Sequence, residues 1–141
     1  ERVGYKFHGN SIMAAIGLVQ LRYLDQDNAY RRQLAQWYRQ YLAGASHVRL
    51  IPMQPGIESA THLFQVRVSN RDELMLALNE NEIYPGVHYR DNTEYTMYKF
   101  GAGTCPNAAK ASSEILSLPM HMSVTHADVQ RIAALIAQYA K

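Results

Sequence analysis

Cysteine is almost absent from this 141-residue sequence, which contains only Cys105. A single thiol excludes an internal disulfide, and chains without disulfides are typical of reducing compartments. We therefore expect a cytoplasmic protein. Cys105 precedes a proline and has no histidine near it in the sequence, a setting that favours an inert thiol over a nucleophile.

The sequence also lacks a large excess of positive or negative charge. Its 14 Lys and Arg residues nearly balance 12 Asp and Glu residues, which gives a net charge of +2. The two signs are interspersed, so we expect no nucleic-acid partner and no anionic membrane. No apolar run reaches the roughly 18 residues of a membrane span, and the N-terminus has no signal-peptide character. It does not begin with methionine, so we expect the true start upstream.

The familiar motifs of catalysis are missing. The six histidines form neither His-x-x-x-His nor Glu-x-x-His, and the lone cysteine cannot complete a ligand set, so we expect no metal site. There is no Gly-x-Ser-x-Gly elbow, no Walker A loop and no dinucleotide fingerprint. Hydrolase and nucleotide-binding classes defined by these motifs are therefore not indicated.

What the sequence does contain is a regular apolar pattern, with 48% apolar residues and room for one core. Helical spacing predicts one long helix over 11–43, capped at Asn10 or Ser11 and ended by Gly44. Such length favours a bend, which we place at Gly17 or at 25–28. Residues 11–24 are apolar on more than one side, so we expect another surface to cover them.

The remaining pattern predicts a small α+β body over 47–141. We expect strands at 48–52, 62–68 and 83–89, helices at 71–81, 107–116 and 126–139, and a long loop at 90–106. Asn70, Asn107 and a Thr125–Asp128 capping box are the expected helix starts. The fold class is thus a three-stranded, at least partly antiparallel sheet packed with helices and preceded by a long N-terminal helix. The chain is one domain, 1–141, whose residues 1–10 lead into the long helix.

Two polar clusters are candidate ligand sites. Lys6, His8 and Asn10 stand at the start of the long helix, where free N–H groups favour a phosphate, although an ordinary capped helix start explains them equally well. The second cluster, 88–90, ends a predicted strand and opens the long loop. A solvated turn is the alternative there.

An ordered set of motifs resembles the C-terminal small domain of the DegT/DnrJ/EryC1/StrS aminotransferases. Each motif is weak alone, but together they cover the chain in order: Gly4-Tyr5, the Ile12–Leu21 stretch, Arg31-Arg32, Tyr38-x-x-Tyr41-Leu42, His62-Leu63-Phe64-x-Val66-Arg67-Val68, Arg71-Asp72-Glu73-Leu74, Gly86-Val87-His88-Tyr89, Glu114–His121 and Thr125-x-x-Asp128-Val129.

The resemblance implies an aspartate-aminotransferase type of fold, a dimer, and pyridoxal phosphate (PLP) held by a lysine Schiff base in a large domain. The implied substrates are nucleotide-linked keto sugars of amino-sugar biosynthesis, with an amino acid such as glutamate as nitrogen donor. None of the lysines present matches the Schiff-base motif; they are Lys6, Lys99, Lys110 and Lys141. We therefore expect that this chain alone binds no cofactor, has no catalytic residue and does not transaminate.

The resemblance also assigns roles to both polar clusters. It places Lys6, His8 and Asn10 near the cofactor phosphate, across a dimer, where many family members have Asn and Arg instead of this Lys and His. It places His88, Tyr89 and Arg90 in the sugar-nucleotide pocket. The expected partner is a second copy or the large domain, bound through 11–24. The alternative function is a detached, non-catalytic module that binds a nucleotide-sugar or a protein.

Overall fold

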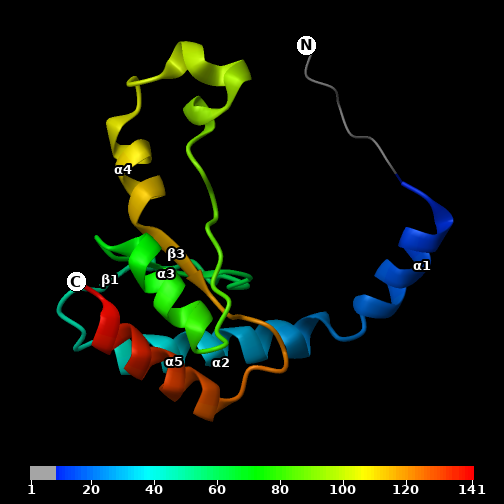
Figure 1. The fold of residues 1–141 in the computed structure, drawn as a ribbon. Coiled ribbons are helices and arrows are strands. Elements are labelled where there is room, and N and C mark those ends of the chain that lie inside the picture. Colours follow the sequence, from blue (N-terminus) through cyan, green and yellow to red (C-terminus); the bar gives the residue numbers. More distant parts are fainter. Residues whose placement is uncertain (1–8) are drawn as a thin grey trace.

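The computed structural model describes residues 9–141 (Figure 1). Along the chain lie helices α1 (Ser11–Gln20) and α2 (Leu24–Leu42), strands β1 (Arg49–Leu50) and β2 (Phe64–Arg67), helix α3 (Arg71–Glu80), the short 3₁₀ helices η1 (Asn92–Glu94) and η2 (Thr96–Gly101), helix α4 (Pro106–Glu114), strand β3 (Ile115–Leu118) and helix α5 (His126–Tyr139). The predicted α+β class is confirmed.

The sheet is antiparallel throughout, in the order β1-β2-β3. In β2 the side chains of Phe64 and Val66 are buried, while Gln65 and Arg67 between them are only half-buried. This alternation follows from the period of two along a strand, which sends neighbouring side chains to opposite faces. One face of the sheet therefore carries the core and the other is polar.

Helices α2, α3 and α5 build the core against the apolar face. Leu34 and Leu42 of α2, Leu74 of α3 and Ile136 of α5 are almost fully buried. Tyr38 joins them; its ring stacks on Phe64 with centroids 5.0 Å apart and its hydroxyl donates to the Pro119 carbonyl at 3.0 Å. Figure 1 shows α2 and α5 lying along the same side of the strands. The polar face is left uncovered by these helices.

The predicted long helix is two consecutive helices, and the break differs from both expected positions. It lies at 21–23, where the amides of Arg22 and Tyr23 donate three residues back, to Val19 and Gln20, in place of the α-helical four. Gly17 stays inside α1, and 25–28 is regular helix in α2. In Figure 1, α1 extends away from the sheet and from the other helices.

The third strand is not the predicted one. Residues 115–118 form β3, although 115 and 116 were expected to finish a helix and 117–118 were assigned to no element. The predicted strand 83–89 contributes only a single bridge, between Gly86 and Ser117. Ile115–Leu118 is an apolar run that suits a buried strand as well as a helix, and pairing with β2 decides its form. Pro85 lacks the N–H that a ladder needs, which limits the other candidate.

The helix starts were predicted with mixed success. Asn10 caps α1 by accepting from the Met13 amide, and the Thr125–Asp128 capping box is present at α5. Asn70 occupies the predicted N-cap position of α3 but makes no side-chain cap hydrogen bond. Its side chain instead donates to the Tyr139 carbonyl and accepts from the Lys141 amide. The cap predicted at Asn107 is also wrong, because α4 already begins at 106, where proline occupies the first turn.

Candidate functional site

The polar face of the sheet and the adjoining 84–91 segment form the candidate site. A hollow of about 290 Å³ lies where this segment crosses β3. Three histidines from distant parts of the sequence line it, His62 before β2, His88 in the crossing segment and His121 after β3, together with Tyr84 and Ser117. The sheet thus gathers side chains that are far apart along the chain.

His88 is held in place by contacts to two strands. Its Nδ1 lies 3.0 Å from the Ser117 hydroxyl, and its backbone carbonyl accepts from the Gln65 side chain at 2.5 Å. Gly86 makes this placement sterically feasible, because a Cβ at that position would lie 2.7 Å from Cε1 of the imidazole. The predicted site residue His88 therefore has a defined orientation toward the hollow.

The other two residues of this predicted cluster behave differently. Tyr89 is largely exposed, with its ring edge-on to that of His88 at 5.1 Å between centroids. Arg90 turns toward the following loop, where it pairs with Glu94 and lies 5.6 Å from the Tyr95 ring centroid. That pairing, through hydrogen bonding and charge, raises the pKa of Arg90. The structure therefore brings His88 and Tyr89 together and directs Arg90 elsewhere.

His62, His121 and Tyr84 were missed by sequence reasoning. His62 and His121 were visible only as isolated histidines, and nothing in their spacing joins them to His88. Their proximity depends on β3 being the neighbour of β2, which the sequence pattern did not indicate.

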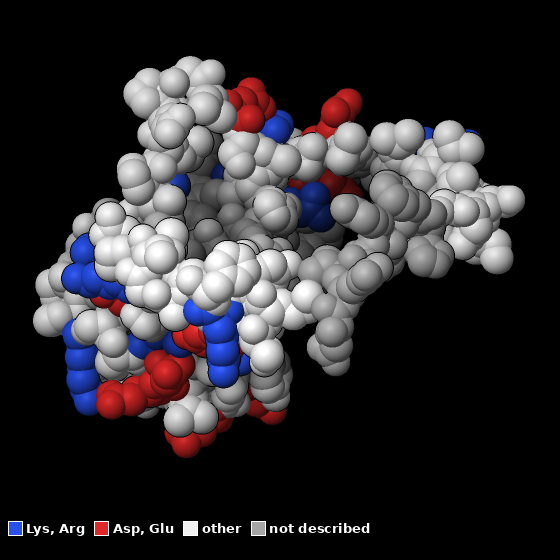
Figure 2. Space-filling view, turned by 90° about the horizontal axis from the view of Figure 1, so that it is seen from above, with Lys and Arg blue, Asp and Glu red and all other residues white. Residues whose placement is uncertain are grey.

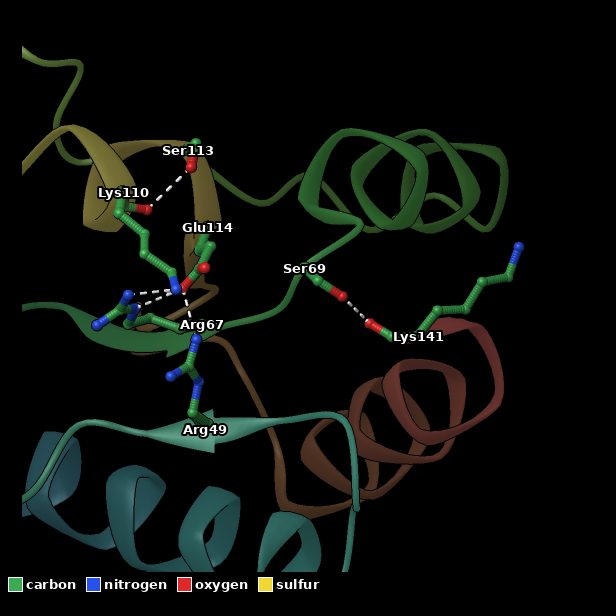
Figure 3. A network of polar contacts seen from close by, with 7 residues as sticks. All are labelled: Arg49, Arg67, Ser69, Lys110, Ser113, Glu114 and Lys141. Carbon is green, nitrogen blue, oxygen red and sulfur yellow. Dashed lines mark hydrogen bonds and ion pairs between the residues drawn. The ribbon is translucent and has the colours of Figure 1, made fainter. Parts of the chain in front are cut away.

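A charged cluster occupies the far end of the same sheet face (Figure 3). Arg49 of β1 and Arg67 of β2 are paired in register and both donate to one carboxylate oxygen of Glu114, at 2.7 and 2.6 Å. Partial burial opposes ionisation of Glu114, but the hydrogen bond and charge of Arg67, with the charges of Arg49 and Lys110, outweigh it and lower its pKa. The cluster holds the strand ends together as an ionised group.

The phosphate cluster is described only in part, since Lys6 and His8 lie outside the described residues. Asn10 is exposed, and its side-chain oxygen Oδ1 caps α1 by accepting from the Met13 amide. Of the lysines within 9–141, Lys141 pairs with Glu73, and none lines a hollow of this part of the chain. The described residues by themselves therefore do not fit a PLP cradle.

Two further findings concern the described residues alone. No group of three or more His, Cys, Asp or Glu side chains in 9–141 is arranged as metal ligands. None of the helices in that range is both long enough and apolar enough to cross a membrane.

Comparison with known proteins identifies the family. The sequence model of the DegT/DnrJ/EryC1/StrS aminotransferase family matches residues 1–137. The chain belongs to this family, and its fold is that of an aminotransferase domain.

Solved structures agree with this assignment. TlmJ, an aminotransferase from Streptoalloteichus hindustanus, is 30% identical over 92% of this chain, with a TM-score of 0.83 and 36% of TlmJ covered. The sugar aminotransferase CalS13 from Micromonospora echinospora is 25% identical over 96% of this chain, with a TM-score of 0.86 and 37% of CalS13 covered. Spr1654 from Streptococcus pneumoniae, in its PLP form, is 27% identical over 95%, with a TM-score of 0.81 and 36% covered.

The chain is short beside these proteins. It spans 33% and 40% of the length of two other solved structures that it matches. The match corresponds to one part of each relative.

Proposed function

We propose that residues 1–141 are the C-terminal small domain of a PLP-dependent aminotransferase that acts on nucleotide-linked keto sugars. The family match over residues 1–137 carries this proposal, and CalS13 is itself described as a sugar aminotransferase. In this proposal the Schiff-base lysine and most cofactor contacts come from outside these residues. PLP, when bound there, acts as the electron sink for the transfer of the amino group.

The role of this domain in the proposal is to bind and orient the sugar-nucleotide. His88 is anchored by Ser117 and Gln65, so its ring and that of Tyr89 present a fixed polar and aromatic surface beside the hollow. An imidazole offers one donor and one acceptor, and a tyrosine ring offers a stacking face, which suit a hydroxylated sugar and its nucleotide base. Arg90, freed from Glu94, would supply a phosphate contact.

The predicted cofactor-phosphate residues Lys6, His8 and Asn10 belong to the same proposal. A lysine and a histidine before a helix N-terminus suit an anion, and the α1 amides add to the positive potential there. In this arrangement the phosphate belongs to the neighbouring subunit of a dimer. The contact would be stronger at acid pH, where the histidine is protonated.

The partner surface in the proposal is α1 and the turn after it. Every residue from Ser11 to Gln20 is exposed, including Ile12 at 73% and Leu18 at 66%, and this helix has no charged residue. In Figure 2, the residues drawn in white in the lobe at the right form a surface with very little blue or red on the face in view. Apolar surface of this kind is characteristic of an interaction site. We assign it to a second copy or to the large domain.

Adding PLP to the 141-residue chain tests the proposal that the Schiff-base lysine lies outside these residues. After borohydride reduction, peptide mass analysis should find no stoichiometric PLP adduct on Lys6, Lys99, Lys110 or Lys141. A stoichiometric adduct on one lysine would contradict the proposal and make this chain a cofactor-binding unit by itself.

A nucleotide-sugar titration separates the proposal from its alternative. Ligand-observed NMR with a UDP-linked hexose should show contacts that His88→Ala weakens and the matched change His47→Ala, at an exposed histidine outside the hollow, does not. Tight nucleotide-sugar binding together with failure to complement a large domain would instead favour a detached binding module.

A further inference from the structure

A second hollow lies on another part of the molecule, between α2 and the 51–61 segment. Two overlapping cavities of about 310 and 340 Å³ share six lining residues: Ala35, Arg39, Met53, Ile57, Ser59 and Thr61. Because they share these residues, they form one continuous groove, which we call the Arg39 groove. A few hundred cubic ångströms is the size of a pocket for a small molecule.

Arg39 lines both cavities, and the position of its guanidinium is fixed on two sides. One terminal nitrogen donates to the Ile51 carbonyl at 3.0 Å, and the guanidinium carbon lies 5.5 Å from the Phe64 ring centroid. The Nε atom is shielded from solvent and has no hydrogen-bond partner. These contacts orient the guanidinium before any ligand arrives, which lowers the entropic cost of binding to it.

The charge of Arg39 is not neutralised within the described part of the chain. No carboxylate in 9–141 lies within 4.0 Å of its guanidinium. The other arginine that lines the groove, Arg32, pairs at 2.9 Å with Glu58, which lines the groove too, so that carboxylate is already neutralised. Arg39 is half-buried, and its partial desolvation without an anionic partner costs some free energy that an incoming carboxylate would offset. Guanidinium groups recognise carboxylates through short, charge-assisted hydrogen bonds.

The walls of the groove are apolar and open to solvent. Met53 and Ile57 are 56% and 58% exposed, and both line it. A ligand that covers them gains hydrophobic stabilisation in addition to its contact with Arg39. A phosphate dianion would place a second, uncompensated charge beside these walls, so a singly charged carboxylate fits better.

We propose that the Arg39 groove binds a small monocarboxylate with an apolar body. The carboxylate accepts a hydrogen bond from Arg39, and the apolar body covers Met53 and Ile57. This inference goes beyond the proposed function and does not depend on it, because none of its residues is assigned there to the cofactor or the sugar.

Phenylacetate is a suitable probe, and phenylacetamide is its neutral counterpart of the same shape. We expect saturable binding of phenylacetate to the full chain, followed by saturation-transfer NMR and calorimetry, with the amide at least about tenfold weaker. Equal affinity for the two compounds, or no saturation by about 10 mM phenylacetate, would overturn the proposal.

Three variants locate the site. Arg39→Gln should weaken phenylacetate binding at least about tenfold, whereas Arg131→Gln, which removes an exposed arginine outside the groove, should leave it unchanged. If Arg39→Gln fails to fold, Ile57→Asp still tests the site, because Ile57 is exposed and its carboxylate would compete for Arg39. Undiminished binding in a folded Arg39→Gln or in Ile57→Asp refutes the assignment.

Discussion

His88 is oriented by three neighbouring residues to which no ligand contact is assigned. Gly86 leaves room for the imidazole, Ser117 faces its Nδ1 and Gln65 holds its carbonyl. The same crossing segment bridges β3 through the Gly86 and Ser117 backbones, at 2.9 and 2.7 Å. Because all these contacts involve His88, a substitution at any of the three neighbours should change the orientation of its ring.

Gly86→Ala tests this arrangement directly. The added methyl group would lie 2.7 Å from the His88 ring, so we expect the ring to leave Ser117 and the free energy of unfolding to fall by about 1–3 kcal/mol. Imidazole NMR shifts of His88 and urea unfolding measure the two effects. Gly44→Ala is the matched control, since nothing lies within 4 Å of a Cβ there. Unchanged His88 shifts in Gly86→Ala would show that the ring is not constrained by this contact.

The lowered pKa of Glu114 predicts that the stability of the fold depends on pH. Its pKa is lower when folded than when unfolded, so its contribution is present at neutral pH and lost as pH falls through the folded pKa. Glu114→Gln should therefore lower the urea midpoint at pH 7, and the gap from the natural protein should shrink below about pH 4. Glu73→Gln, at an exposed pair with Lys141, should show little of either effect. A gap that is constant from pH 7 to 3 would exclude a role for the ionised carboxylate.

At the scale of elements, the clearest local signals sit at helix starts. The Thr125 hydroxyl caps α5 by accepting from the Asp128 amide, and the Asp128 carboxylate accepts from the Thr125 amide at 2.8 Å. These hydrogen bonds from the Thr125 hydroxyl and backbone lower the pKa of Asp128, whose partial desolvation acts in the opposite direction. The cap begins a helix that buries Val129 and Ile132 against the core.

Loss of this cap should destabilise the fold without changing its shape. Thr125→Ala is expected to reduce the free energy of unfolding by about 1 kcal/mol, because the Asp128 amide loses its acceptor. Thermal or urea unfolding measures the change, with Ser123→Ala in the adjacent turn as control. An effect no larger than that control would mean that tertiary packing alone sets the start of α5.

The break between α1 and α2 is also decided at this scale. The helical hydrogen-bond pattern tightens at Arg22 and Tyr23, then resumes when the Asp27 amide donates to the Tyr23 carbonyl at 2.9 Å. No glycine or proline lies at the break, so residue preferences do not predict its position. Apolar periodicity continues through it, which is why the sequence indicates one helix.

At the scale of the whole molecule, the dominant feature is an apolar helix, α1, that has no buried residue and no packing partner among residues 9–141. Of the large hydrophobic residues in α1, Ile12, Met13, Ile16 and Leu18 are all more than half exposed. The body helices, by contrast, bury their apolar faces against the sheet and against one another. We therefore propose that this exposed surface is covered in an assembly, by a second copy or by a large domain.

Ile16→Asp tests the assembly. We expect the natural chain to self-associate in solution and Ile16→Asp to shift it to monomer, because a charge in an apolar interface must be desolvated. Light scattering coupled to size exclusion reports the mass. Leu76→Asp is the control, since Leu76 is 62% exposed on α3 and away from this surface. A monodisperse monomer for the natural chain would contradict self-association through α1.

The sequence by itself determined the class of fold, the strands near 49 and 64–67, and helices α3 and α5. These depend on the local period of apolar residues and on capping groups, which act within a few residues of the backbone that they order. It also indicated His88 as a site residue, through a motif that follows a strand candidate. The role of that motif in sugar binding stays a prediction.

Only the tertiary structure decided which apolar run becomes the third strand and which histidines meet. Ile115–Leu118 can form either a helix or a strand locally, and it becomes a strand because β2 supplies the hydrogen-bond partners on one side. That choice places Ser117 under His88 and brings His62 and His121 to the same hollow. Proximity between residues dozens of positions apart is a property of strand pairing, and no short-range pattern in the sequence encodes it.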